Sequence, residues 1–100
     1  QWTLEIKKDS SGALVFKGPL TVAHIESAHS QLEPLLDECI REAVLDLSMV
    51  DDIDISGLQL LYAIKKNIES EGVFRINAIS PQVKEYVLLS GFEAILKEAT

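Results

Sequence analysis

The sequence predicts a single α/β domain built around a mixed β-sheet. After an initial pair of strands, segments with the apolar pattern of strands alternate with segments of helical spacing. The 100 residues are enough for one hydrophobic core, and no linker, internal repeat or low-complexity run divides them. We therefore treat residues 1–100 as one domain, in which strand–helix–strand connections join the later strands.

The chain opens with a predicted β-hairpin. Apolar and polar side chains alternate over residues 2–7, which indicates a half-buried strand. Residues 9–12 read Asp-Ser-Ser-Gly, a composition typical of tight turns. A second strand follows over residues 13–17, and the short turn makes the two strands antiparallel. We expect Gly18 and Pro19 to end the second strand.

A first helix follows the hairpin. Thr21 is a suitable cap, and apolar residues then recur at helical spacing: Ile25, Ala28, Leu32, Leu35, Leu36 and Cys39. Pro34 lies inside this pattern, where it removes a backbone donor, so we expect a kink or an early end there. Cys39 belongs to the apolar set and is therefore expected in the core rather than as a reactive thiol.

The rest of the chain alternates between strands and helices. A buried strand is predicted over residues 43–47, a helix over about 56–69 that Gly72 ends, and a strand over 73–79. Ser80 and Pro81 then form a favourable helix start. The third helix carries apolar Val83, Tyr86, Val87 and Leu89. A last short segment with Phe92, Ile95 and Leu96 is expected to be helical.

Composition excludes several classes of function. A net charge of −7 argues against nucleic acid and against anionic membrane surfaces, and it suits a partner with a basic face. The single cysteine excludes an internal disulfide and favours the reducing cytosol. We find no signal peptide, no membrane-spanning run and no glycine-rich phosphate loop, so a cytoplasmic protein without a cofactor is expected.

The most informative stretch is residues 44–58. A buried strand leads into Asp51, Asp52 and Asp54, which cannot lie in a core and therefore predict an acidic turn. Ser56 then stands at the start of the second helix. A hydroxyl at a helix start, beyond the carboxyl end of a strand, occupies the place where binding sites form in open α/β sheets.

The same stretch carries a family resemblance. The run Asp54-Ile55-Ser56-Gly57-Leu58, following Leu45-Asp46-Leu47-Ser48, resembles the signature of STAS domains, and in particular that of bacterial anti-sigma factor antagonists. The order of predicted elements agrees over essentially the whole chain. The resemblance implies a mixed sheet of about four to five strands with helices packed mainly on one face. One departure is Ile55, where antagonists usually carry Ser or Thr.

The resemblance also implies a function. It indicates a non-enzymatic bacterial signalling module that acts in transcription regulation. Such a module binds a regulatory serine kinase of the anti-sigma type, is phosphorylated on Ser56, and is restored by a phosphatase. Asp54 would shape the loop and assist recognition by the kinase. The partner-binding residues would be Asp52, Asp54, Ile55, Ser56, Gly57 and Leu58. A phosphate carries about −1.5 to −2 charges, so beside three aspartates it would repel a partner that had matched a neutral hydroxyl.

Other interpretations of these residues stay open. Ser56 can be the helix N-cap, a role compatible with later phosphorylation. Asp54 can be a turn residue that bonds the backbone, and Gly57 can serve a close approach to the loop. A different class of function is a STAS adaptor subunit of a transport or signalling complex, in which Ser56 is never modified. Ile55 favours that branch.

Enzymatic and metal-binding interpretations are weaker. Asp52, Asp54, Ser56 and Gly57 match the first half of a calcium loop, but the required glutamate position holds Ala63, which excludes the site. A loose magnesium site at the three aspartates is a minor alternative. A triad of Ser56, His24 and Asp54 lacks the G-x-S-x-G pattern.

Four further polar positions have modest expected roles. His24 and His29 lie on different faces of the first helix, have no second ligand at suitable spacing and are expected at the surface. Asp46 and Ser48 are expected to line the same end of the sheet as Ser56, and Ser48 is equally compatible with a strand-end cap.

Overall fold

The computed structural model describes residues 3–37, 41–70, 72–92 and 95. Strands and helices follow the predicted order. They are β1 (Glu5–Lys8), β2 (Leu14–Leu20), the short 3₁₀ helix η1 (Val22–His24), α1 (Ile25–Leu36), β3 (Glu42–Ile53), α2 (Ile55–Glu69), β4 (Val73–Ile79) and α3 (Pro81–Leu89).

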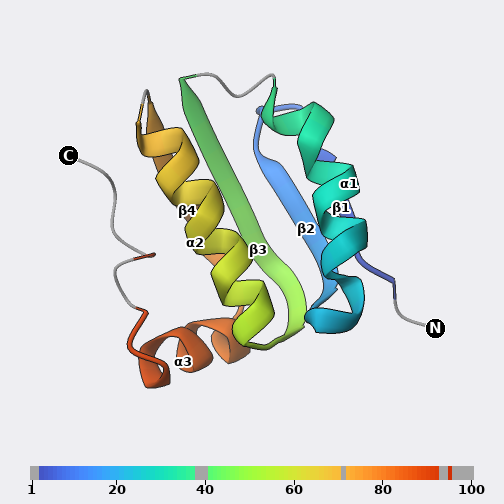
Figure 1. Ribbon diagram of the computed structural model, residues 1–100, viewed down its shortest axis with the longest axis vertical. Coiled ribbons are helices and arrows are strands. Elements are labelled where there is room, and N and C mark those ends of the chain that lie inside the picture. The colour runs from blue at the N-terminus through green and yellow to red at the C-terminus, as the bar shows by residue number, and fades with distance from the viewer. Residues whose placement is uncertain (1–2, 38–40, 71, 93–94, 96–100) are drawn as a thin grey trace.

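The four strands form one mixed sheet in the order β1-β2-β3-β4. β1 pairs antiparallel with β2, as the short hairpin predicted, whereas β2–β3 and β3–β4 are parallel. Helices α1 and α2 lie over the same face of the sheet, and α3 lies at the end of the sheet where β4 finishes (Figure 1). The predicted class, a mixed α/β sheet with helices mainly on one face, is therefore confirmed.

The core lies between the sheet and the two helices of that face. Its largest fully buried side chains come mainly from β2, β3, β4 and α2, and they include Leu14, Phe16, Leu45, Leu47, Phe74, Leu58 and Leu61. Strand residues alternate between this core and solvent, and α2 buries residues at helical spacing. Each fully buried side chain of this kind contributes about 1.5–3 kcal/mol relative to exposure.

Two strands are longer than the sequence predicted. β3 continues through Asp51 and Asp52 to Ile53, so the expected acidic turn is wrong. Both aspartates are exposed within the strand, so their charges stay in contact with water and no turn is needed to keep them out of the core. β2 likewise continues past Gly18 and Pro19, with register irregularities on either side of Lys17. Irregular pairing of this kind tolerates a proline, which cannot donate a ladder hydrogen bond.

Helix α1 differs from its prediction at both ends. Thr21 precedes η1 rather than α1, and its hydroxyl lies 3.2 Å from His24 Nδ1 instead of capping the backbone. Pro34 does not stop the helix, which continues to Leu36. The proline removes one backbone donor from the last turn, and the helix ends two residues later. The predicted core position of Cys39 falls outside the described residues.

The start of helix α3 agrees closely with its prediction. Ser80 is the N-cap, its hydroxyl accepts from the Val83 amide at 3.4 Å and donates to the Val50 carbonyl at 2.7 Å, and Pro81 opens the helix. Leu89, predicted on the apolar face, is instead 80% exposed. Of the expected last segment, Ile95 is buried and its amide donates to the Phe92 carbonyl, whereas Leu96 lies outside the described residues.

Candidate functional site

The site is organised by the side chain of Asp54. One carboxylate oxygen, Oδ1, accepts from the Gly57 amide at 3.1 Å, and the other, Oδ2, accepts from the Val22 amide at 2.9 Å. The backbone amide of Asp54 also donates to the Leu20 carbonyl at 3.4 Å. A single aspartate therefore caps α2 and holds the start of η1 against it. It joins the ends of β2 and β3 at one point.

Gly57 lets the first turn of α2 lie directly against the end of β2. A Cβ at this position would stand 2.2 Å from the Leu20 carbonyl oxygen and 2.8 Å from a side-chain carbon of Ile53. Both distances are well below van der Waals contact, so any side chain would force the helix away from the sheet. The close approach expected at Gly57 is thus an approach to the backbone of β2.

Ser56 is the second residue of α2, and its side chain is partly exposed. The interpretation of Ser56 as the N-cap is wrong, and the interpretation of Asp54 as a residue that bonds the backbone ahead of the helix is confirmed. The helix begins one residue earlier than expected, and Asp54 is its N-cap. Because the Asp54 carboxylate already accepts the amide of Gly57, the hydroxyl of Ser56 has no hydrogen-bond partner among the described residues. The side chain of Ser56 is thus partly exposed and has no part in the cap.

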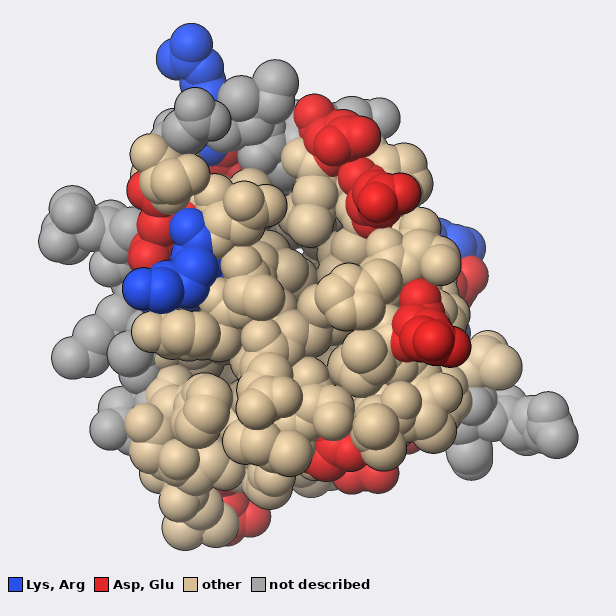
Figure 2. Space-filling model, in the orientation of Figure 1, with Lys and Arg blue, Asp and Glu red and all other residues tan. Residues whose placement is uncertain are grey.

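Exposed apolar side chains belong to the segments on either side of Asp54, η1 and the first turn of α2. Val22 is 70% exposed and Ile55 is 45% exposed. Four and seven residues beyond Ile55, on the same side of α2, lie Gln59 and Tyr62, both exposed. We call Val22, Ile55, Ser56, Gln59 and Tyr62 the Ser56 surface. Figure 2 shows that charged side chains are absent from most of the middle of the face over α1 and α2 and lie around its margin.

The six residues predicted to bind a partner do not all reach the surface. Asp52, Ile55 and Ser56 are exposed or partly exposed, and Asp54 is partly buried with both carboxylate oxygens bonded. Gly57 is buried, and the side chain of Leu58 is fully buried in the core. Val22 was not predicted, since it contributes a backbone amide and an ordinary apolar side chain, neither of which gives a motif.

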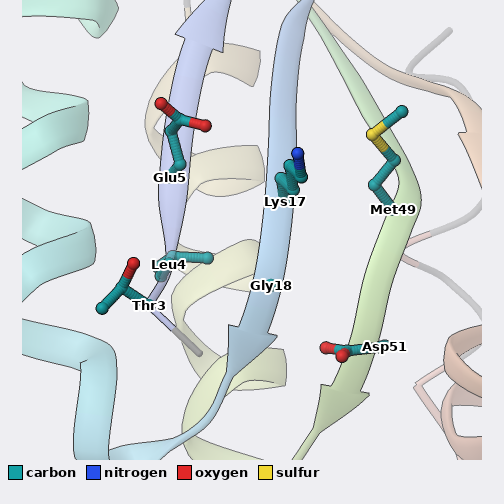
Figure 3. Close-up of a pocket in the computed structure, with 7 residues that line it drawn as sticks. All are labelled: Thr3, Leu4, Glu5, Lys17, Gly18, Met49 and Asp51. Atoms are coloured by element: carbon teal, nitrogen blue, oxygen red, sulfur yellow. The ribbon is translucent and has the colours of Figure 1, made fainter. Parts of the chain in front are cut away.

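The three aspartates of the predicted acidic turn are not gathered around Ser56. Asp51 lines a hollow on the other face of the sheet together with Lys17 and Met49 (Figure 3). Asp54 is committed to backbone amides. Within the described ranges, no three side chains of the metal-ligating types converge on one point. The geometry therefore offers no cluster for the magnesium alternative.

The remaining polar candidates have local partners. His24 lies beside Thr21, and no hydrogen bond links it to Ser56 or Asp54 in the described part of the chain. Asp46 Oδ1 accepts from the amide and the hydroxyl of Ser48 at 2.9 and 2.6 Å. Ser48 lies inside β3, so its expected role as a strand-end cap is wrong.

The helices of the described residues are too short or too polar to cross a lipid bilayer.

Comparison with known proteins identifies the family. The profile of the STAS domain matches residues 2–99. Among solved structures, the chain is similar to the anti-sigma factor antagonist SpoIIAA in its unphosphorylated form, with a TM-score of 0.63 and 17% sequence identity. The likeness covers 100% of this chain and 89% of that one, and at this identity it concerns the fold. A search of curated proteins finds no match. The chain belongs to the STAS domain family.

Proposed function

We propose that this STAS domain is a non-enzymatic signalling module that docks a regulatory protein on the Ser56 surface. Phosphorylation of Ser56 then releases the partner. The observation that carries the proposal is that different residues at the start of α2 cap the helix and present a hydroxyl. Asp54 caps the helix, whereas the Ser56 hydroxyl is accessible and unbonded among the described residues. Modification of Ser56 therefore leaves the cap in place.

The switch follows from the character of the surrounding surface. Phosphorylation would add about −1.5 to −2 charges beside the exposed apolar side chains of Val22 and Ile55. A partner that covers these side chains would have to strip water from the phosphate, which costs free energy unless a cation compensates. The nearby Asp54 carboxylate adds to the negative charge that the partner would have to cover. This account replaces the expected patch of three aspartates, because Asp51 lies on the other sheet face.

The partner class comes from the family and from the likeness to an anti-sigma factor antagonist. We propose a serine kinase of the anti-sigma type as partner, with a phosphatase that restores Ser56, in a bacterial cytoplasm and in transcription regulation. Asp52 and Ile55 are proposed contacts. Leu58 acts only through the core, because its side chain is fully buried.

A second candidate is a STAS adaptor subunit whose surface stays docked and is never modified. It is favoured by Ile55, which is 45% exposed and places an apolar side chain where antagonists usually carry a second hydroxyl. An exposed isoleucine is a good anchor for a permanent interface and contributes nothing to phosphate transfer.

The test begins with protein isolated from its native cell. We expect the intact mass to show one phosphate that maps to Ser56, and we expect the co-purified partner to bind Ser56→Ala but to bind Ser56→Asp at least about tenfold more weakly. Ser10→Asp is the matched control, because Ser10 is an exposed serine in the hairpin turn at the other end of β2. An unmodified Ser56, with equal binding of the alanine and aspartate variants, would contradict the switch and support the adaptor.

A further inference from the structure

The sheet face that α1 and α2 leave open contains a hollow. Its lining includes Leu4, Glu5, Lys17, Gly18, Met49 and Asp51, from β2, β3 and the start of the hairpin (Figure 3). Gly18 contributes no side chain to it. Met49 is 56% exposed, a large exposed fraction for an apolar side chain in a central strand. The hollow and an exposed apolar side chain, that of Met49, thus lie next to each other on the same face.

Two charges beside the hollow have no ion-pair partner among the described residues. Lys7 pairs with Glu5 at 3.0 Å, and Arg75 pairs with Glu42 at 3.1 Å. Neither Lys17 nor Asp51 forms such a pair, although both line the hollow. The positive charge lies on β2 and the negative charge lies on the neighbouring strand β3.

These features are self-complementary under one symmetry operation. Two copies can be placed with their open sheet faces together and related by a two-fold axis. If this axis is parallel to the strands and lies midway between β2 and β3, then β2 of each copy lies over β3 of the other. Because Lys17 and Met49 are register partners, Met49 then lies over the hollow beside Gly18 of the second copy. The same operation brings Lys17 within side-chain reach of Asp51 of the second copy, and the reverse contact forms as well.

We propose that the protein forms a homodimer through this open sheet face, held by two reciprocal Lys17–Asp51 contacts and two Met49 insertions. Packed sheets lie about 10 Å apart, a separation that lysine and methionine side chains can bridge. The face opposite to the dimer interface carries α1 and α2. The Ser56 surface therefore stays free, and the dimer does not depend on the proposed signalling function.

Sedimentation equilibrium on the wild type and two charge variants tests the proposal. We expect the wild type to dimerise, and we expect Lys17→Glu and Asp51→Lys each to weaken dimerisation by at least about tenfold, because each places like charges opposite one another. Mixing the two variants is the decisive step. In a mixed dimer Glu at position 17 faces Lys at position 51, and the second contact is the native one, so a dimer with one copy of each variant should form.

The controls separate this interface from general charge effects. Lys66→Glu changes the same charge on α2, on the other face, and should leave dimerisation unchanged. Circular dichroism establishes that each variant is folded, and Lys17→Gln replaces Lys17→Glu if the latter is not. A wild-type monomer at about 1 mM would overturn the proposal. So would stronger dimerisation of Asp51→Lys, which is less acidic than the wild type, or a mixture that stays monomeric.

Discussion

Two aspartates, one near each end of β2, both accept hydrogen bonds from backbone amides, but with different structural results. Asp9 Oδ1 accepts from the amides of Ser11 and Ala13 at 2.9 and 3.0 Å and from the Ser11 hydroxyl at 2.7 Å. All its partners lie within four residues. Asp54 accepts from Gly57, three residues later, and from Val22, 32 residues earlier. A carboxylate that bonds amides makes a turn in the first case and assembles a surface in the second.

The two regions also differ in what surrounds them. The Asp9 turn is exposed, and its geometry depends only on its own sequence. The Asp54 junction depends on the parallel pairing of β2 with β3, in which Leu20 is the register partner of Ile53. The junction is therefore correct only when the sheet is correct. Changes at the junction should cost more than changes at the turn, and three experiments test that ranking.

The largest effect is expected from Gly57→Ala. Its Cβ would meet the Leu20 carbonyl oxygen at 2.2 Å, and backbone cannot move aside cheaply, so we expect a loss of about 3 kcal/mol in the free energy of unfolding. The matched change in the turn is Gly12→Ala. That Cβ has no neighbour within 4 Å, and only the positive φ of 91° opposes it, at about 1–2 kcal/mol.

Urea unfolding of both variants measures the difference. Equal losses would mean that backbone conformation alone limits both positions, and that the contact between α2 and β2 yields by a small shift. A loss at Gly57 that exceeds the loss at Gly12 would support the junction as the more constrained region.

A smaller effect is expected from Asp54→Ala. It removes the acceptor for two amides, and loss of a helix N-cap typically costs about 1 kcal/mol, with an upper range near 2. Ser56→Ala, two residues later, is the control and should stay within about 0.5 kcal/mol of the wild type, since its hydroxyl has no partner in the described residues. Thermal or urea unfolding measures the change in the free energy of unfolding for both variants. A larger loss for Ser56→Ala than for Asp54→Ala would restore Ser56 as the cap.

The local features of the fold could be predicted from the sequence. The Asp9 turn and the Ser80-Pro81 helix start are set by residues within a few positions of one another, and the structure agrees with each. Strand directions could be predicted because a short turn makes neighbouring strands antiparallel and a helical connection joins parallel strands. The STAS resemblance added the placement of the helices on one face.

The site could be predicted only in part. The motif located Ser56 correctly at the start of α2, but propensity favours serine and aspartate about equally as caps, so the sequence left open which of Ser56 and Asp54 bonds the first turn. The structure shows that it is Asp54. The extension of β3 through Asp51 and Asp52 was missed because aspartates cannot lie in a core and were read as a turn, whereas both are exposed within the strand. Val22 was missed because its amide meets Asp54 across 32 residues, a contact that no local pattern encodes.

The smallest effect is expected at the turn, and it should depend on pH. The hydrogen bond from the Ser11 hydroxyl, together with those from the backbone amides, lowers the pKa of Asp9 below its ordinary value of 3.8. A carboxylate whose pKa is lower in the folded state stabilises the fold above the unfolded pKa, and this contribution is lost as the pH falls through the folded pKa. Asp9→Asn should therefore be less stable than the wild type near pH 7, and the gap should close below pH 3.8. Urea unfolding across this range measures the gap, with the exposed Asp37→Asn as control. A gap that stays constant with pH would show that the turn uses the shape of Asp9 and not its charge.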